Sequence, residues 1–167
     1  VCQEAAERSA QLVVTHHPVI FHPLRRLEPE SVVYNAVQAG LAVISTHTCM
    51  DKAPGGVSAV LAEKLGLMNE EDLPGGDGFV KIGEPQGLLS GLDLARMVKE
   101  RLGLRSLRVY DAGFLARKVA VCSGSGGSYF EEVRAAGADA FVTGDVKHDV
   151  AVSAANAGLT LIDAGHY

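Results

Sequence analysis

The chain has 167 residues, of which 47% are hydrophobic and 5% aromatic, and its formal net charge is -5 at pH 7. This length suits one domain, or two small intertwined ones, with a substantial hydrophobic core. The acidic balance and the scattered lysines and arginines disfavour direct nucleic-acid binding. No apolar stretch reaches the length of a membrane span, and no signal peptide is apparent. Three widely spaced cysteines fit a reducing compartment. We therefore expect a cytoplasmic protein without membrane association.

Short aliphatic runs alternate with helical patterns along the chain, and this alternation predicts an α/β fold with largely parallel strands. Ser90 is suited to cap one helix, with Asp93 three residues further on, and Gly103 is suited to end that helix. Residues 69–78 read as an acidic, glycine-rich loop. The predicted helices are 1–10, 31–40, 58–65, 90–102, 129–136 and 149–157, and the predicted strands are 12–15, 41–45, 79–82, 107–111, 118–122, 140–143 and 159–163.

Two parts of the chain resemble each other. Residues 12–16 can be laid over 140–144, and residues 39–44 over 157–162. Each part reads as a strand, a polar loop, a helix, an Ala-Gly pair and a second strand. This similarity predicts two related halves, about 1–66 and 104–167, joined by 67–103. Chance similarity between two strand–helix–strand units is the alternative.

Histidine or carboxylate side chains follow three of the predicted strands directly. His16 and His17 end the first, a cluster with Asp51 follows the second, and His166 follows the last. Adjacent side chains of a strand point to opposite faces, but at the strand end two histidines can turn towards two nearby metals. Pro18 confines His17 to extended geometry. Histidine is the commonest metal ligand, and a carboxylate supplies compensating charge. These residues predict a two-metal centre at one sheet edge.

Each of these residues also has an ordinary interpretation. A single histidine at a strand end is commonly just a hydrogen-bonded polar residue, which applies to His22 and His148 taken one at a time. Asp51 also suits a cap or turn before the glycine pair at 55–56. His166 lies one residue from the chain end, where a frayed tail is the neutral expectation. Taken together, the clusters favour a metal site.

The glycine-rich segment 124–128 lies between a predicted strand and a predicted helix. Backbone N–H groups and the helix dipole can hold a phosphate at such a place. No P-loop lysine follows it, however, and a tight turn that requires glycine is the alternative. No nucleophile elbow with an acid and a base in order is visible, and Cys49 shows no sign of activation. Nucleophilic triad chemistry is therefore disfavoured.

Four longer motifs follow one another along the chain: THHP at 15–18, HTCMDKAPGGV at 47–57, GADAFVTGD at 137–145 and LIDAGHY at 161–167. In this order they resemble the Nif-three-like family, whose members are often named GTP cyclohydrolase 1 type 2 homologues. The resemblance covers nearly the whole chain. It implies a three-layer α/β/α fold of two related, intertwined halves, a dinuclear metal centre and a ring-shaped homohexamer built from dimers.

The resemblance also implies roles for individual residues. Carried over motif by motif, the metal ligands would be His16, His17, Asp51 and His166, and the residues that line the substrate pocket would be His47 and His148. The family has a bridging glutamate a few residues beyond its last histidine, past the point where this chain stops. Because the chain also opens inside a helix, we expect a single domain, 1–167, that is truncated or disordered at both ends.

The resulting prediction is a protein with two divalent metal ions that hydrolyses a small, nucleotide-like substrate. Zinc, iron, manganese, nickel and cobalt all suit mixed imidazole and carboxylate ligands. The alternative is a non-enzymatic protein, either a metallochaperone or a regulatory and interaction protein. An enzyme keeps an open coordination position on its metal, whereas a structural site is closed by protein ligands.

Overall fold

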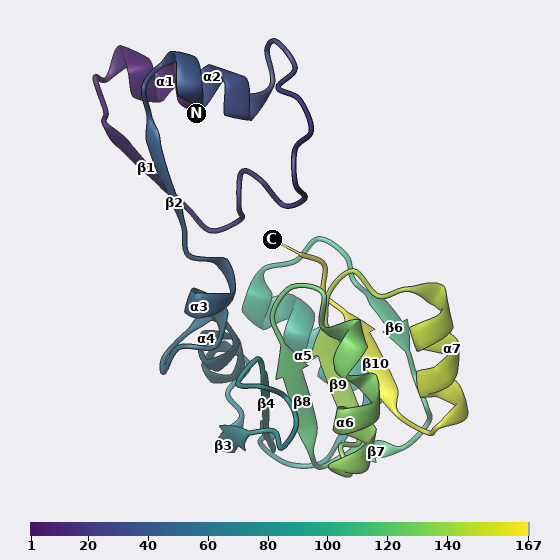
Figure 1. The fold of residues 1–167 in the computed structure, drawn as a ribbon. Coiled ribbons are helices and arrows are strands. Elements are labelled where there is room, and N and C mark those ends of the chain that lie inside the picture. Colours follow the sequence, from purple (N-terminus) through teal and green to yellow (C-terminus); the bar gives the residue numbers. More distant parts are fainter. Residues whose placement is uncertain (167) are drawn as a thin grey trace. The chain divides into compact units, whose positions relative to one another are not determined.

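The computed structural model describes residues 1–166, and it divides into two compact units, Val1–Met50 (unit 1) and Asp51–Tyr167 (unit 2). Each unit contains strands of its own (Figure 1). The organisation as a single domain with two related halves stays a prediction. None of the helices in the described part is both long and apolar enough to cross a membrane.

Unit 1 is a small parallel sheet with two helices. Its elements are α1 (Cys2–Glu7), β1 (Leu12–Thr15), α2 (Val32–Gln38) and β2 (Ala42–Ser45), and α3 (His47–Asp51) runs across the boundary to unit 2. β1 and β2 pair in parallel, from Leu12 opposite Ala42 to Thr15 opposite Ser45. Ser31 caps α2, because its Oγ accepts a hydrogen bond from the Tyr34 N–H at 3.2 Å.

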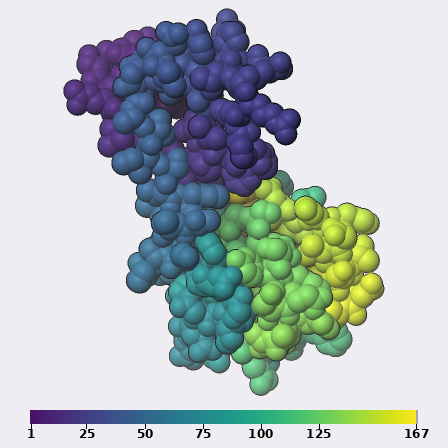
Figure 2. Space-filling model, in the orientation of Figure 1, coloured from purple at the N-terminus to yellow at the C-terminus, as the bar shows by residue number. Residues whose placement is uncertain are grey.

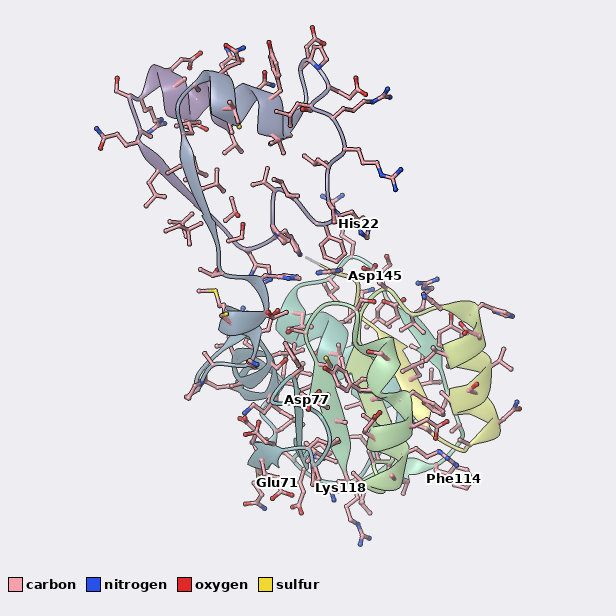
Figure 3. The ribbon with its side chains drawn as sticks, viewed as in Figure 1. His22, Glu71, Asp77, Phe114, Lys118 and Asp145 are labelled. Atoms are coloured by element: carbon pink, nitrogen blue, oxygen red, sulfur yellow. The ribbon has the colours of Figure 1, made fainter. Side chains whose placement is uncertain are left out.

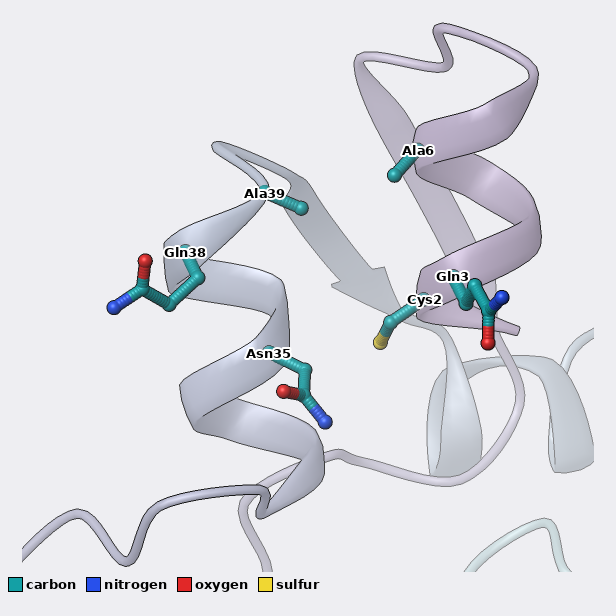
Figure 4. A pocket seen from close by; sticks show the side chains of 6 residues that line it. All are labelled: Cys2, Gln3, Ala6, Asn35, Gln38 and Ala39. Atoms are coloured by element: carbon teal, nitrogen blue, oxygen red, sulfur yellow. The ribbon is translucent and has the colours of Figure 1, made fainter.

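The interior of unit 1 is small. Among residues 1–50, all of which the structure describes, Ala5 and Ala36 are the only buried residues. A hollow of about 420 Å³ between α1 and α2 is lined by short or polar side chains, namely Cys2, Gln3, Ala6, Asn35, Gln38 and Ala39 (Figure 4). On one face of the sheet, Leu12, Val14 and Ile44 are 46%, 63% and 53% exposed. Unit 1 therefore buries little apolar surface of its own.

Unit 2 is built on a mixed six-stranded sheet in the order β3-β4-β8-β9-β10-β6. The three central strands β8, β9 and β10 are parallel, whereas β3, β4 and β6 pair antiparallel with their neighbours. The elements are α4 (Val57–Lys64), β3 (Met68–Asp72), β4 (Val80–Glu84), β5 (Leu89–Ser90), α5 (Gly91–Leu102), β6 (Arg108–Tyr110), β7 (Leu115–Ala116), β8 (Val119–Cys122), a 3₁₀ turn (Gly126–Tyr129), α6 (Phe130–Ala135), β9 (Ala140–Thr143), α7 (His148–Asn156) and β10 (Thr160–Asp163).

Side chains on the two faces of this sheet enter two separate cores. Val119 and Val121 pack with residues of α4 and α5, whereas Ala120 and Cys122, which point the opposite way, pack with residues of α6 and α7. Phe141, fully buried in β9, belongs to the second core. Helices α6 and α7 lie over this face of the sheet (Figure 1), and the green and yellow part of the chain that contains them forms much of the visible surface of unit 2 (Figure 2). The predicted three-layer α/β/α fold is confirmed, with mixed rather than largely parallel pairing.

Local chemistry sets the ends of several elements. The Ser90 Oγ accepts from the Asp93 N–H at 3.1 Å where α5 begins, and Gly103 ends that helix with a left-handed φ of +66°. The prediction of a loop over 69–78 is wrong in its first part. There β3 pairs with β4, although every residue of β3 is exposed.

Candidate metal centre

Three histidines meet where the two strands of unit 1 end. Because β1 and β2 are paired in register and end together, His16 and His17 follow one strand beside His47, which follows the other. The backbone N–H of His47 donates to the carbonyl of His16 at 2.9 Å. The ring centroids of His16 and His17 are 4.8 Å apart, and each lies 5.5 Å from that of His47.

This histidine cluster (His16, His17 and His47) has the chemistry of a metal site. One ligand nitrogen from each ring lies within 4.8 Å of the others. Imidazole nitrogens are donors that zinc takes at about 2.0–2.1 Å. His16 and His47 are half-buried and His17 is exposed. The donors fit a transition metal, and the cluster remains reachable from solvent.

Hydroxyl groups hold the strand ends below the cluster. The Thr15 Oγ1 donates to the carbonyl of His17 at 2.8 Å and lies 2.9 Å from the Ser45 Oγ. The Thr46 Oγ1 donates to the Thr15 carbonyl at 3.3 Å. His22 lies further along the loop after β1 (Figure 3), where its ring meets that of Phe21 at a centroid distance of 5.0 Å.

In unit 2, His166 lies on the loop that follows β10. Its Nδ1–H donates to the Asp145 Oδ2 at 2.8 Å, and the two side chains are 34% and 59% exposed. Asp145 lies on the loop after β9, at the carboxyl edge of the parallel strands, whereas Lys118 lies at the opposite edge before β8 (Figure 3). This edge is where an open α/β sheet places its ligands.

A buried carboxylate ties the loops after β9 and β10 together. Asp163, 4% exposed, accepts from the Val146 N–H at 3.2 Å and from the Gly165 N–H at 3.0 Å. It also accepts from the Arg108 guanidinium, and this hydrogen bond raises the pKa of Arg108. The Asp163 carboxylate therefore fixes both residues that adjoin the Asp145–His166 pair.

The glycine-rich segment after β8 packs tightly. The Thr143 Oγ1 accepts from the Gly126 N–H at 2.8 Å and donates to the Gly124 carbonyl at 3.1 Å. A Cβ on Gly126 would lie 2.6 Å from both the Cys122 Cβ and the Thr143 Oγ1. Close packing therefore accounts for glycine at 126, as the tight-turn interpretation predicts.

A cavity of about 290 Å³ adjoins this segment, and its lining is mainly apolar. The residues are Val57, Leu61, Lys64, Leu102, Leu104, Cys122, Ser123, Gly124, Val142, Thr143, Gly144, Ala164 and Gly165. Burial, with a smaller contribution from the Asp51 carboxylate, raises the pKa of the Cys122 thiol to about 12. This thiol is therefore protonated at neutral pH and is not suited to act as a nucleophile.

The predicted site residues are distributed over both units. The structure brings His16 and His17 together and adds His47, for which the family resemblance implies a place in the substrate pocket. Asp51 ends α3 half-buried, and His148 is exposed as the first residue of α7. The roles assigned to these residues stay predictions.

Asp145, the partner of His166, was missed in the sequence. Its place after a buried strand, like that of Asp51, is the signal that could have revealed it.

Known proteins match the chain over its whole length. The model of the Duf34/NIF3 (NGG1p interacting factor 3) family matches residues 1–167. A GTP cyclohydrolase 1 type 2 homolog of Lactococcus lactis is 34% identical over 173 residues, which cover 98% of this chain and 66% of the relative. One of Streptomyces coelicolor is 35% identical over 179 residues, which cover 98% and 63%. The chain thus spans about two thirds of the length of these curated relatives.

A solved structure supports the fold independently. A Bacillus cereus protein related to NIF3 superposes with a TM-score of 0.88 over 99% of this chain and 75% of that one, at 23% sequence identity. This likeness concerns the fold alone. The family model and the relatives above 30% identity lead to one assignment. The chain belongs to the Duf34/NIF3 family.

Proposed function

We propose that this protein is a metal-dependent hydrolase that acts on a small, nucleotide-like substrate through two divalent metal ions. The histidine cluster carries the proposal, because three ligand nitrogens within 4.8 Å of one another are a ready set of transition-metal donors. The names of the relatives support a nucleotide, since they are called homologues of a GTP cyclohydrolase.

The proposed ligands are His16, His17, Asp51 and His166. His16 and His17 each bind one ion, and the Asp51 carboxylate supplies negative charge that imidazoles lack. His166 binds through a ring already held by a carboxylate at 2.8 Å. This assignment rests on the family motifs in the sequence and on the donor chemistry within each unit.

Two further histidines are assigned to the substrate. His47 and His148 contact the substrate, where each ring can donate or accept a hydrogen bond. The place of His47 beside His16 and His17 suits this role, since its ring lies next to two of the proposed metal ligands. When bound, two such ions act as Lewis acids and lower the pKa of water towards neutrality.

Metal content is the first measurement. We expect about two transition-metal ions per chain by elemental analysis after reconstitution, as in two-metal hydrolases, and loss of metal from the His16→Ala/His17→Ala double variant. His22→Ala is the matched control, because it removes an exposed histidine from the same loop. Metal retained in the double variant, or absent from the wild type, would contradict the proposal.

Hydrolysis of GTP and related nucleotides is the second measurement. We expect product formation that depends on added metal and is abolished in the double variant. Metal binding without turnover of any nucleotide would contradict the hydrolase and favour the alternative, a metallochaperone or a regulatory protein.

We also propose a homo-oligomer of the hexamer-of-dimers type, which sedimentation analysis tests directly. The cytoplasmic location stays a prediction from the sequence.

A further inference from the structure

The Asp145–His166 pair has the geometry of a carboxylate that orients a metal-binding imidazole. A neutral imidazole carries one N–H, and a carboxylate can only accept. The 2.8 Å hydrogen bond between the His166 Nδ1 and the Asp145 Oδ2 therefore fixes the proton on Nδ1 and the lone pair on Nε2. Histidines that bind metals commonly donate their other N–H to such a carboxylate.

The backbone at this place is built to bring the two loops together. A Cβ on Gly144 would lie 2.2 Å from the Gly165 carbonyl oxygen, a backbone atom that has no freedom to swing away. Only glycine at 144 therefore allows the loop after β9 to approach the loop after β10 so closely. The next residues along these two loops are Asp145 and His166.

Asp145 itself has a left-handed backbone, with φ at +50°. Apart from glycine, Asp and Asn adopt this conformation most readily. The Asp163 carboxylate accepts from the residue after Asp145 and from the residue before His166. The backbone beside Asp145 and the backbone beside His166 are thus both held in place without a bound metal.

The loop after β8 also lies close to the His166 ring, and its glycine leaves space beside Nε2. A Cβ on Gly124 would lie 3.2 Å from the His166 Nε2, close enough to crowd the ring. Gly124 also has a left-handed φ of +64°, which glycine adopts without strain. The loops after β8, β9 and β10 therefore all shape the surroundings of one imidazole.

We propose that Asp145 is the positioning residue of His166: its carboxylate holds the ring so that Nε2 faces the metal ion. This inference rests on the proposed metal centre and adds to it a residue outside the predicted ligand set. Asp145 does not bind the metal in this proposal, and its effect passes through the His166 ring.

Substitutions at 145 test the proposal without disturbing the backbone. Asp145→Gly removes the carboxylate and keeps a residue that tolerates the left-handed φ, and Asp145→Asn keeps an acceptor oxygen but removes the charge. Asp77→Gly is the matched control, because Asp77 is also an exposed aspartate with φ at +50°, on the loop between β3 and β4. Circular dichroism verifies that each variant folds.

Two measurements on the whole chain separate positioning from binding. Long-range ¹H–¹⁵N correlation spectra of the metal-free protein report which ring nitrogen of His166 carries the proton. Titration with Zn²⁺ against a chelating dye gives the dissociation constant of the site that His166→Ala removes. We expect the Nδ1–H tautomer in the wild type, its loss in Asp145→Gly, and an affinity about 10- to 100-fold weaker. Asp145→Asn should fall between, and Asp77→Gly should match the wild type.

The outcomes distinguish this inference from the proposed function. An unchanged tautomer, or an unchanged Zn²⁺ affinity in Asp145→Gly, would overturn the positioning role while the metal centre stands. A wild type that binds no Zn²⁺ would overturn both.

Discussion

The two units offer the same chemistry on very different scaffolds. In each, parallel strands end at a common edge, and histidines follow those strands. In unit 2 every residue of β8 and β9 is buried, with helices on both faces of the sheet. In unit 1 a two-stranded sheet has one apolar face exposed, and two alanines are all that residues 1–50 bury. A histidine can therefore lie at the end of a parallel strand whether or not that strand is held in a well-packed core.

This difference indicates how each histidine is held. Two-stranded sheets are marginal in water without further packing, so the histidine cluster depends on a few hydrogen bonds such as that of Thr15. The His166 ring, by contrast, lies on loops fixed by a buried carboxylate and a packed core. Regions with few buried contacts open locally at low free-energy cost. We therefore expect metal binding to order unit 1 more than unit 2.

Core truncation is expected to show the largest contrast between the units. Phe141→Ala removes a fully buried ring from unit 2 and should lower the free energy of unfolding by about 3–5 kcal/mol. Val14→Ala, at a side chain 63% exposed in unit 1, should change it by less than about 0.5 kcal/mol. Urea denaturation followed by circular dichroism measures both. Comparable losses would show that the face of β1 is covered in solution.

Metal addition is expected to reduce the difference in local stability between unit 1 and unit 2. Zn²⁺ at a hundred times its dissociation constant should stabilise the binding-competent state by about 2.7 kcal/mol. Because the histidine cluster follows β1 and β2, the amides of these strands should show the largest slowing of hydrogen exchange. Equal slowing throughout the six-stranded sheet, or none in β1 and β2, would argue against a site at the cluster. The His16→Ala/His17→Ala variant provides the control.

A single methyl group tests the close contact of the loops in unit 2. Gly144→Ala places a Cβ against the Gly165 carbonyl, so the backbone must shift, at a cost of about 1–3 kcal/mol. Gly127→Ala is the control, because its Cβ would meet only ordinary contacts at 3.6 Å and beyond, with Val150. Thermal denaturation of the two variants should separate them clearly, and equal midpoints would contradict the close packing of the two loops.

At neutral pH, the smallest expected effect concerns the cysteines. Burial raises the pKa of Cys122 from 9.0 to about 12, so between these values the native thiol keeps a proton that the unfolded chain has lost. The free energy of unfolding should therefore fall as the pH rises through this range. Below pH 9.0 the thiol is protonated in both states, so the stabilisation that is lost at higher pH is fully present there. Cys122→Ala should weaken this dependence in urea denaturation. At neutral pH, alkylation should label the exposed Cys49 and spare Cys122.

Local chemistry made parts of the fold predictable. Ser90 and Gly103 mark the two ends of α5 because capping and a left-handed C-terminal residue depend on adjacent residues alone. The central strands are similarly evident, since short, continuous aliphatic runs suit strands buried on both faces. β3 was not predictable, because its polar residues become a strand only through pairing with β4.

The candidate site was predictable in its residue types and less so in its grouping. His16 and His17 are adjacent in sequence, so their proximity needs no fold. His47 joins them only because Thr15 lies opposite Ser45 in the sheet. A shift of one residue in the pairing of β1 with β2 would turn the side chains that follow β2 to the other face. Asp145 was missed because an aspartate after a glycine is ordinary in a turn. Its role depends on a contact with a loop 21 residues away.

The left-handed backbone at Asp145 also restricts how this position can evolve. The residues that tolerate it best are Asp, Asn and Gly, and a single base change in an aspartate codon reaches either of the other two. Drift at this codon can therefore remove the charge or the whole side chain while the loop keeps its path. In the proposed metal centre, one such mutation lowers the metal affinity at His166 and leaves the fold intact.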